Sequence, residues 1–148
     1  MKKIIIAIDS FKGCLTSAEA GKAAEKGIKS INPFCHTSVI PIADGGEGLL
    51  DVLITATKGK YITLSAHGPL MKMAKTHYGL SGNGRTAIIE MAAISGLPLV
   101  PIEQRNPMLT TTFGTGELIK DALNKGCRNF IIGIGGSATN DAGLGMLQ

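Results

Sequence analysis

The first fifty residues repeat one pattern twice: a short apolar run, then a polar loop that opens with an acid, then a helical stretch. Residues 3–8 form a β-branched apolar run that stops at Asp9, which predicts a strand buried on both faces. A second strand is expected at about 38–42, ahead of Asp44. Strands that alternate with helices at this spacing predict a parallel sheet with right-handed crossovers.

Both helical stretches carry start signals. Thr16 and Glu19 have the spacing of a capping box, and the residues after them place small and apolar side chains on one helical face that ends near Asn32. Asp44 and Glu47 have N-cap and N3 spacing ahead of a second apolar helical face. We therefore expect helices after both loops.

The pattern changes after residue 58. Residues 60–91 alternate polar and apolar side chains, and Asn83-Gly84 between two such runs predicts an antiparallel hairpin. A helix is expected at 116–124, ended by Gly126, and a last strand at 129–134. The expected domains are 1–58 as the first part of a parallel lobe and 59–105 as the start of a second lobe. Residues 106–148 form a third segment that the sequence assigns to neither lobe.

Composition narrows the classes of function. The 148 residues carry a formal net charge of +4, include no Trp, and cluster neither Lys nor Arg, which argues against nucleic-acid and anionic-membrane partners. No apolar run approaches the roughly 18 residues of a membrane span, and the N-terminal run is too short for a signal peptide. Three cysteines without C-x-x-C spacing favour a reducing compartment. A cytoplasmic protein is expected.

Two acidic loops follow the first two predicted strands. In the first, Asp9 and Lys12 are suited to a metal and a phosphate oxygen, or else to a capped turn and a solvated cation. In the second, Asp44 and Glu47 flank two glycines and are suited to binding Mg²⁺ or to general-base work. The structural alternative is that these two acids cap a helix N-terminus.

A glycine-rich loop follows the last predicted strand. Its small residues, backbone N–H groups and hydroxyls suit a phosphate cradle; these residues are Gly135, Gly136, Ser137, Thr139, Asn140 and Asp141. Gly133, Gly135 and Ala138 also match the relaxed dinucleotide pattern G-x-G-x-x-A, whereas the P-loop pattern is absent from the sequence. A tight strand-to-helix turn is the alternative explanation.

Two further features leave alternatives open. Thr112 and Gly114 lie in a hydroxyl- and glycine-rich stretch that suits either phosphate contact or capping of the next helix. Glu90 ends an apolar run and is either a site acid or a charge paired inside the fold.

Taken together, the ordered motifs resemble the type I glycerate kinase family. The resemblance covers the whole chain and rests on five segments: Ile8–Gly13 with Leu15–Ser17, Pro41–Gly48, Ile89–Ala92 with Gly96-Leu97, Thr112–Ile119, and Ile132–Asp141 with Leu147-Gln148. Ala142 departs from it, because the family usually carries glycine there; a methyl group is tolerable if the local φ is negative.

The resemblance implies a two-lobed α/β kinase with a parallel, flavodoxin-like lobe and a second, mixed lobe that contains antiparallel strands. It also implies ATP, Mg²⁺ and D-glycerate as ligands, with 2-phosphoglycerate favoured over 3-phosphoglycerate as product. Asp44 is expected near the transferring phosphoryl group as metal ligand or base, with Glu47 beside it. Lys12 is expected to stabilise phosphate charge, and Asp9 to orient Lys12 or Mg²⁺.

Family members are more than twice as long as this chain, so a fragment of a longer kinase is expected. Residues 1–148 alone are then expected to be inactive, and the exposed sheet makes a homo-oligomer a further expectation. Two alternatives of another class stay open: a non-catalytic nucleotide- or metabolite-binding domain, and a fragment of a dinucleotide-dependent oxidoreductase.

Overall fold

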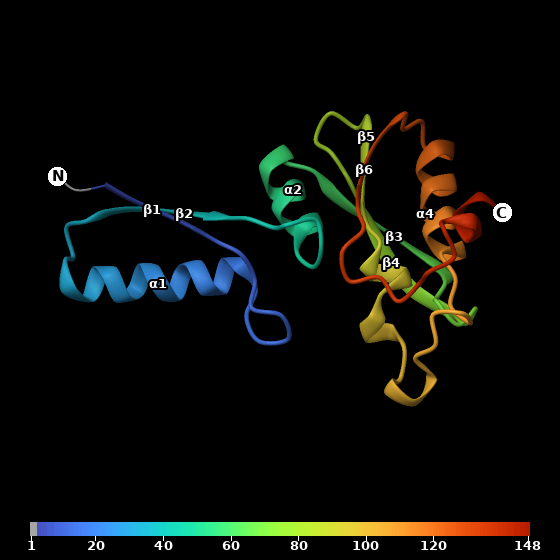
Figure 1. The fold of residues 1–148 in the computed structure, drawn as a ribbon. Helices are drawn as coiled ribbons and strands as arrows, with labels where there is room; N and C mark the ends of the chain where they lie inside the picture. Colours follow the sequence, from blue (N-terminus) through green and yellow to red (C-terminus); the bar gives the residue numbers. More distant parts are fainter. Residues whose placement is uncertain (1–2) are drawn as a thin grey trace.

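The computed structural model describes residues 3–148, which form two β-sheets (Figure 1). β1 (Lys3–Ile8) and β2 (His36–Pro41) pair in parallel as a two-stranded sheet. β3 (Lys60–His67), β4 (Met73–Leu80), β5 (Thr86–Glu90) and β6 (Asn129–Gly133) form a four-stranded sheet in that order. Its first two pairings are antiparallel and β5–β6 is parallel. The predicted mixed α/β class, with early parallel strands and a later antiparallel segment, is confirmed.

The helices connect and cover these strands. They are α1 (Ser17–Ile31), α2 (Leu49–Thr57), α3 (Ala92–Ser95) and α4 (Phe113–Asn124), with short 3₁₀ turns at Leu97–Leu99, Ile102–Gln104 and Leu144–Leu147. Among the described residues, no helix is both long and apolar enough to cross a bilayer.

Helix α1 packs against one face of the β1–β2 pair. Its N-terminus has the predicted capping box between Thr16 and Glu19. The buried Ser17 hydroxyl donates to the carbonyl of Ile8 (2.6 Å) and accepts from the backbone N–H of Ile42 (3.0 Å), so it ties together the ends of both strands. Gly21 is required for this close packing, because a Cβ there would lie 2.4 Å from a methyl carbon of Val39.

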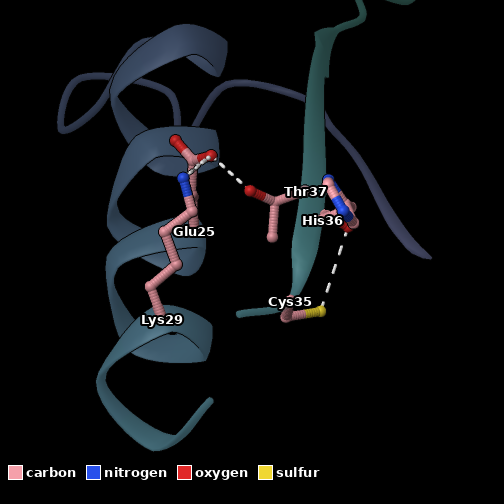
Figure 2. A network of polar contacts seen from close by, with 5 residues as sticks. All are labelled: Glu25, Lys29, Cys35, His36 and Thr37. Carbon is pink, nitrogen blue, oxygen red and sulfur yellow. Dashed lines mark hydrogen bonds and ion pairs between the residues drawn. The ribbon is translucent and has the colours of Figure 1, made fainter. Parts of the chain in front are cut away.

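A polar contact holds the other end of this unit together (Figure 2). The Glu25 carboxylate of α1 accepts from the Thr37 hydroxyl of β2 and from Lys29 one helical turn further on. The pKa of Glu25 is lowered, first by the hydrogen bond from Thr37 and then by that from Lys29. The α1–β2 contact is therefore polar at its exposed rim and apolar or small inside.

The four-stranded sheet is covered on both faces, as Figure 1 shows. On one face, Ile88 of β5 packs against Leu50 and Ile54 of α2. The opposite face packs against α4 in a core of buried residues: Ala66, Tyr78, Ala87, Ile89, Ile94, Leu118, Ala122 and Cys127. The alternation of Ala87, Ile88 and Ile89 between the two faces is what a central strand requires. Gly84 has a φ of +69° in the predicted β4–β5 hairpin turn.

Two predicted helix starts are wrong. Helix α2 begins at Leu49 with Gly48 as its N-cap, at a φ of +90°, so Asp44 does not cap it. Helix α4 begins at Phe113 rather than at 116. Glycine disfavours helix, yet Gly114 and Gly116 are helical because close packing against the backbones of His67 and Met146 overrides local propensity.

The last strand, which the sequence assigned to neither lobe, belongs to the mixed sheet, because β6 pairs in parallel with β5. A 3₁₀ turn at Leu144–Leu147 follows the glycine-rich loop, with Gly143 at its N-cap.

Candidate active site

The loops that follow β2 and β6 meet along two glycine-rich backbones. The N–H of Gly135 donates to the carbonyl of Gly45 (3.1 Å). A Cβ on Gly135 would lie 2.6 Å from Cα of Gly46, and a Cβ on Gly133 would lie 2.6 Å from the carbonyl oxygen of Gly45. Backbones can approach this closely only without side chains, which explains the glycines in both motifs.

Glu90, at the carboxyl end of β5, fixes the acidic loop to the mixed sheet. Its Oε2 accepts from the backbone N–H groups of Gly48 and Leu50, at 3.2 Å each, and so caps the first turn of α2. Burial raises the pKa of Glu90, the two N–H donors oppose that effect, and the neighbouring carboxylates of Asp51 and Glu47 raise it further. Glu90 is thus held by backbone N–H groups and forms no ion pair among residues 3–148, and it also lines the cavity described below.

Asp44 and Glu47 lie on the exposed side of this loop. Asp44 Oδ1 accepts from the N–H of Gly46 (3.1 Å), which forms a local turn and leaves its second carboxylate oxygen unengaged. Glu47 has no hydrogen bond or ion pair to any residue of the 3–148 range. Both carboxylates are therefore accessible to a ligand.

These two carboxylates suit Mg²⁺ carried by a nucleotide. The described part of the chain holds no group of three or more His, Cys, Asp or Glu side chains that could enclose an ion. In phosphoryl-transfer sites Mg²⁺ is usually held by one or two carboxylates plus substrate phosphates and waters, so a full protein cage is not needed. Asp44 and Glu47 are the two carboxylates of this loop that could serve in such a partial ligand set.

The loop after β1 places Asp9 and Lys12 apart. Asp9 Oδ1 accepts from the N–H of Ser10 (2.6 Å), and a Phe11–Leu15 bridge closes the loop. Lys12 is exposed and makes no ion pair with a carboxylate of residues 3–148, so Asp9 does not hold it here.

A cavity of about 480 Å³ lies between the β1–α1–β2 unit and the mixed sheet. Ser10, Thr16 and Ser17 line it from the first unit, while Glu47 and Glu90 line it from the other side. Of the predicted catalytic residues, only Glu47 lines this cavity; the loop after β1 contributes Ser10, and Asp9, Lys12 and Asp44 are not among its lining residues.

The glycine-rich loop after β6 is held by the segment around residues 95–97. The N–H of Ala138 donates to Ser95, and the N–H of Leu97 donates to Gly136. The hydroxyls of Ser137 and Thr139 lie 2.8 Å apart and bond to each other. Two of the predicted phosphate-cradle N–H groups, those of Gly135 and Thr139, are thus already used inside the protein.

Asp141 is bound within the protein. Its Oδ2 accepts from the N–H and the hydroxyl of Thr112, both at 2.8 Å, and its carboxylate also accepts from the N–H groups of Gly143 and Gly145. Burial acts to raise the pKa of Asp141, but these hydrogen bonds outweigh it, and the pKa is lowered. Thr112 is buried and holds Asp141, and Gly114 is buried inside α4.

Two residues of the loop behave differently. Asn140 is exposed. Ala142 has a φ of +53°, so the condition under which alanine was expected to be tolerable, a negative φ, is not met.

The sequence did not assign roles to the residues that hold the loops together. Ser17 hydrogen-bonds to Ile8, and Ser95 accepts a hydrogen bond from Ala138. Nothing in the local sequence of either serine indicates its partner. For Glu90 a signal existed, because an acid directly after a buried strand lies at the sheet edge where α/β proteins bind ligands.

Comparison with known proteins identifies the family. The sequence profile of the Glycerate kinase family matches residues 4–148. The chain is 57% identical over 146 residues to the glycerate kinase of Haemophilus influenzae, 55% to that of Bacillus subtilis, and 52% to the glycerate 2-kinase of Escherichia coli. Each alignment covers 99% of this chain and 38–39% of the relative.

A solved structure gives the same result. The crystal structure of a Salmonella typhimurium LT2 protein assigned as glycerate kinase 2 superposes with a TM-score of 0.82 at 49% identity, over all of this chain and 40% of the other. The chain thus spans about two fifths of the length of its relatives, as expected for part of a longer kinase. These matches do not support the oxidoreductase alternative. The chain belongs to the glycerate kinase family.

Proposed function

We propose that the full-length protein containing this chain transfers phosphate from Mg-ATP to D-glycerate and favours 2-phosphoglycerate as product. The proposal is supported by membership of the family and by relatives named glycerate kinase and glycerate 2-kinase. The observation that carries it is the contact between the acidic loop and the glycine-rich loop at the carboxyl ends of β2 and β6. Ligands of α/β proteins bind at such strand ends.

The proposed roles follow from the polar atoms of each side chain that make no hydrogen bond or ion pair within residues 3–148. Asp44, with one unengaged oxygen, accepts the proton of the attacking hydroxyl or holds the metal, and Glu47 is the second metal ligand. Mg²⁺, when bound, neutralises charge on the phosphates. Lys12 is an exposed cation for the transferring phosphoryl group. Closure of the remaining lobe over the cavity would exclude water.

The glycine-rich loop is proposed to contact the acid substrate or its phosphate. Ser137 and Thr139 supply hydroxyl groups, and Gly136 and Asn140 lie exposed beside them. Asp141 and Thr112 act here by holding the loop in place, since their polar atoms already bond to each other.

A coupled ADP-release assay tests the proposal. The full-length protein should show turnover with Mg-ATP that depends on D-glycerate, and ³¹P NMR of the product identifies the phosphorylated carbon. Acetate, which lacks a hydroxyl, and simple sugars serve as comparison acceptors. Turnover with these acceptors and none with D-glycerate would contradict the proposal.

A further inference from the structure

A second cavity adjoins the glycine-rich loop. It measures about 250 Å³ and is formed where the segment 97–110 faces residues 137–139. Its polar lining residues are Arg105, Asn106, Thr110, Ser137 and Thr139, and none of its nine lining residues is acidic.

One hydrogen bond orients the guanidinium group of Arg105, and no ion pair neutralises its charge within residues 3–148. Its Nε donates to the carbonyl of Val100 (3.2 Å), which fixes one edge of the guanidinium group. No carboxylate of residues 3–148 pairs with it, so its terminal N–H donors remain available.

Asn106 presents donors as well. The N–H of Met108 donates to Asn106 Oδ1 (3.0 Å), so the atom on that side must be the oxygen. The side-chain NH₂ group is then left to donate elsewhere.

One hydroxyl hydrogen is also unused. Ser137 Oγ accepts from the N–H of Thr139 (3.0 Å), and the two hydroxyls share one hydrogen bond. Whichever hydroxyl donates in that bond, the other keeps its hydrogen for a ligand. Thr110 does not contribute, because its hydroxyl already donates to the carbonyl of Ala138 (2.8 Å).

We infer that this cavity binds the carboxylate group of a small hydroxy acid, with Arg105, Asn106 and the Ser137–Thr139 hydroxyl pair as donors. We call it the carboxylate pocket. The assignment rests on the proposed function for the identity of the acid, D-glycerate. It adds two residues without a predicted role, Arg105 and Asn106, to the proposed substrate-binding residues.

Three features favour a carboxylate over a nucleotide phosphate chain. The pocket has one cation, which balances a single negative charge, and the planar guanidinium group matches the two oxygens of a carboxylate. Leu97, Val100 and Pro107 provide apolar wall for a short carbon skeleton. A cavity of about 250 Å³ is also small beside the 300–1,000 Å³ typical of sites for larger ligands.

The pocket and the acidic loop adjoin the same glycine-rich segment. Ser137 lines the pocket, and Gly135, two residues before it, contacts Gly45 and Gly46 of the acidic loop.

The test is isothermal titration of the full-length protein and its variants with D-glycerate, inorganic phosphate and Mg-ATP in separate arms. Arg105→Gln should weaken D-glycerate binding roughly tenfold or more, because a charged bidentate contact is lost. Arg105→Lys should give a smaller loss, because the charge remains without the planar fork. Thr139→Val should weaken binding roughly threefold. Mg-ATP affinity should stay within about twofold of wild type in all three variants, because the nucleotide binds elsewhere.

Arg85→Gln is the matched control, because Arg85 is an exposed arginine outside the pocket. Circular dichroism and thermal midpoints show that each variant is folded, and Thr139→Val keeps the test open if Arg105→Gln does not fold. Unchanged D-glycerate binding in folded Arg105→Gln would overturn the assignment. So would a loss confined to phosphate or Mg-ATP, or a wild-type protein that does not bind D-glycerate.

The two proposals fail separately. If D-glycerate binds through Arg105 but is not phosphorylated, the proposed function is wrong and the carboxylate pocket stands. If D-glycerate is phosphorylated with an unchanged KM in Arg105→Gln, the pocket assignment is wrong and the function stands.

Discussion

Asp44 is the residue on which the proposed chemistry depends most, and the structure separates its chemical role from a structural one. Its only hydrogen bond within residues 3–148 is the turn contact with Gly46, which an asparagine oxygen can also accept. Asp44→Asn should therefore change the free energy of unfolding by less than about 1 kcal/mol. If Asp44 is the base or a metal ligand, the same substitution should lower kcat by roughly 10²-fold or more.

Urea unfolding and steady-state kinetics of the full-length variant measure both quantities. Near-normal kcat would show that Asp44 only forms the turn. Equal losses in stability and kcat would show that the kinetic effect is indirect.

Ala142 carries a backbone cost that a single substitution can remove. At a φ of +53° alanine is disfavoured by roughly 1–2 kcal/mol relative to glycine. Glycine loses more chain entropy than alanine on folding, but this opposing cost is smaller. Ala142→Gly should therefore raise the free energy of unfolding by about 0.5–1 kcal/mol.

Ala23→Gly is the matched control, because Ala23 is exposed inside α1 with helical backbone. The same substitution there should destabilise by about 0.5–1 kcal/mol. Chemical denaturation of both variants gives the comparison, and destabilisation by Ala142→Gly would contradict the interpretation of strain.

Local signals predicted the elements whose partners are near in sequence. The capping box at Thr16 and the hairpin at Gly84 both formed as expected, since every residue they need is within a few positions. The start of α2 was wrong because its cap is Glu90, from another strand.

The same limit applies to the candidate site. The glycine-rich and acidic loops were recognisable by composition, and their position at strand ends followed from the alternation of strand and helix. Their mutual contact and the role of Arg105 were not predicted, because both depend on β6 pairing with β5. Pairing between distant strands leaves no local trace in the sequence.

The Glu90 contact between β5 and α2 should make stability depend on pH. The pKa of Glu90 is raised in the folded state, so the folded protein binds this proton more tightly than the unfolded chain. The stabilisation that results is fully present below the unfolded pKa, about 4.3, and is lost as pH rises through the folded pKa. Glutamine does not titrate. The stability of wild type relative to Glu90→Gln should therefore fall as pH rises from 4 toward 7.

Urea unfolding of both proteins across this range is the measurement. Glu103→Gln, at an exposed position in the 102–104 turn, is the surface control. A pH-independent difference between wild type and Glu90→Gln would contradict the assigned cause.

At the scale of the whole molecule, the β1–β2 pair presents an uncovered apolar face. Ile6 points toward α1 and is 8% exposed, whereas Ile5 and Ile40 on the other face are 59% and 48% exposed. Isolated apolar faces of this kind drive association. We expect residues 1–148 expressed alone to self-associate and to show no turnover with Mg-ATP and D-glycerate.

Sedimentation and the ADP-release assay test this expectation. Ile5→Lys should reduce association without restoring activity, because Ile5 lies on the exposed face and does not line the cavity. A stable monomer with activity close to that of the full-length protein would contradict the placement of the site between two lobes.

The contact between Gly46 and Gly135 also determines the order in which parts of the chain fold during synthesis. During synthesis, β1, α1 and β2 and the β3–β4–β5 hairpins can all form from residues that have already left the ribosome, since their pairings are complete by Glu90. The acidic loop gains its glycine-rich neighbour only after β6 emerges and pairs with β5. In pulse-labelling hydrogen exchange, the amide of Gly135 should gain protection later than the β3–β4 amides. A nascent chain would then be unable to bind its ligands until the mixed sheet is complete.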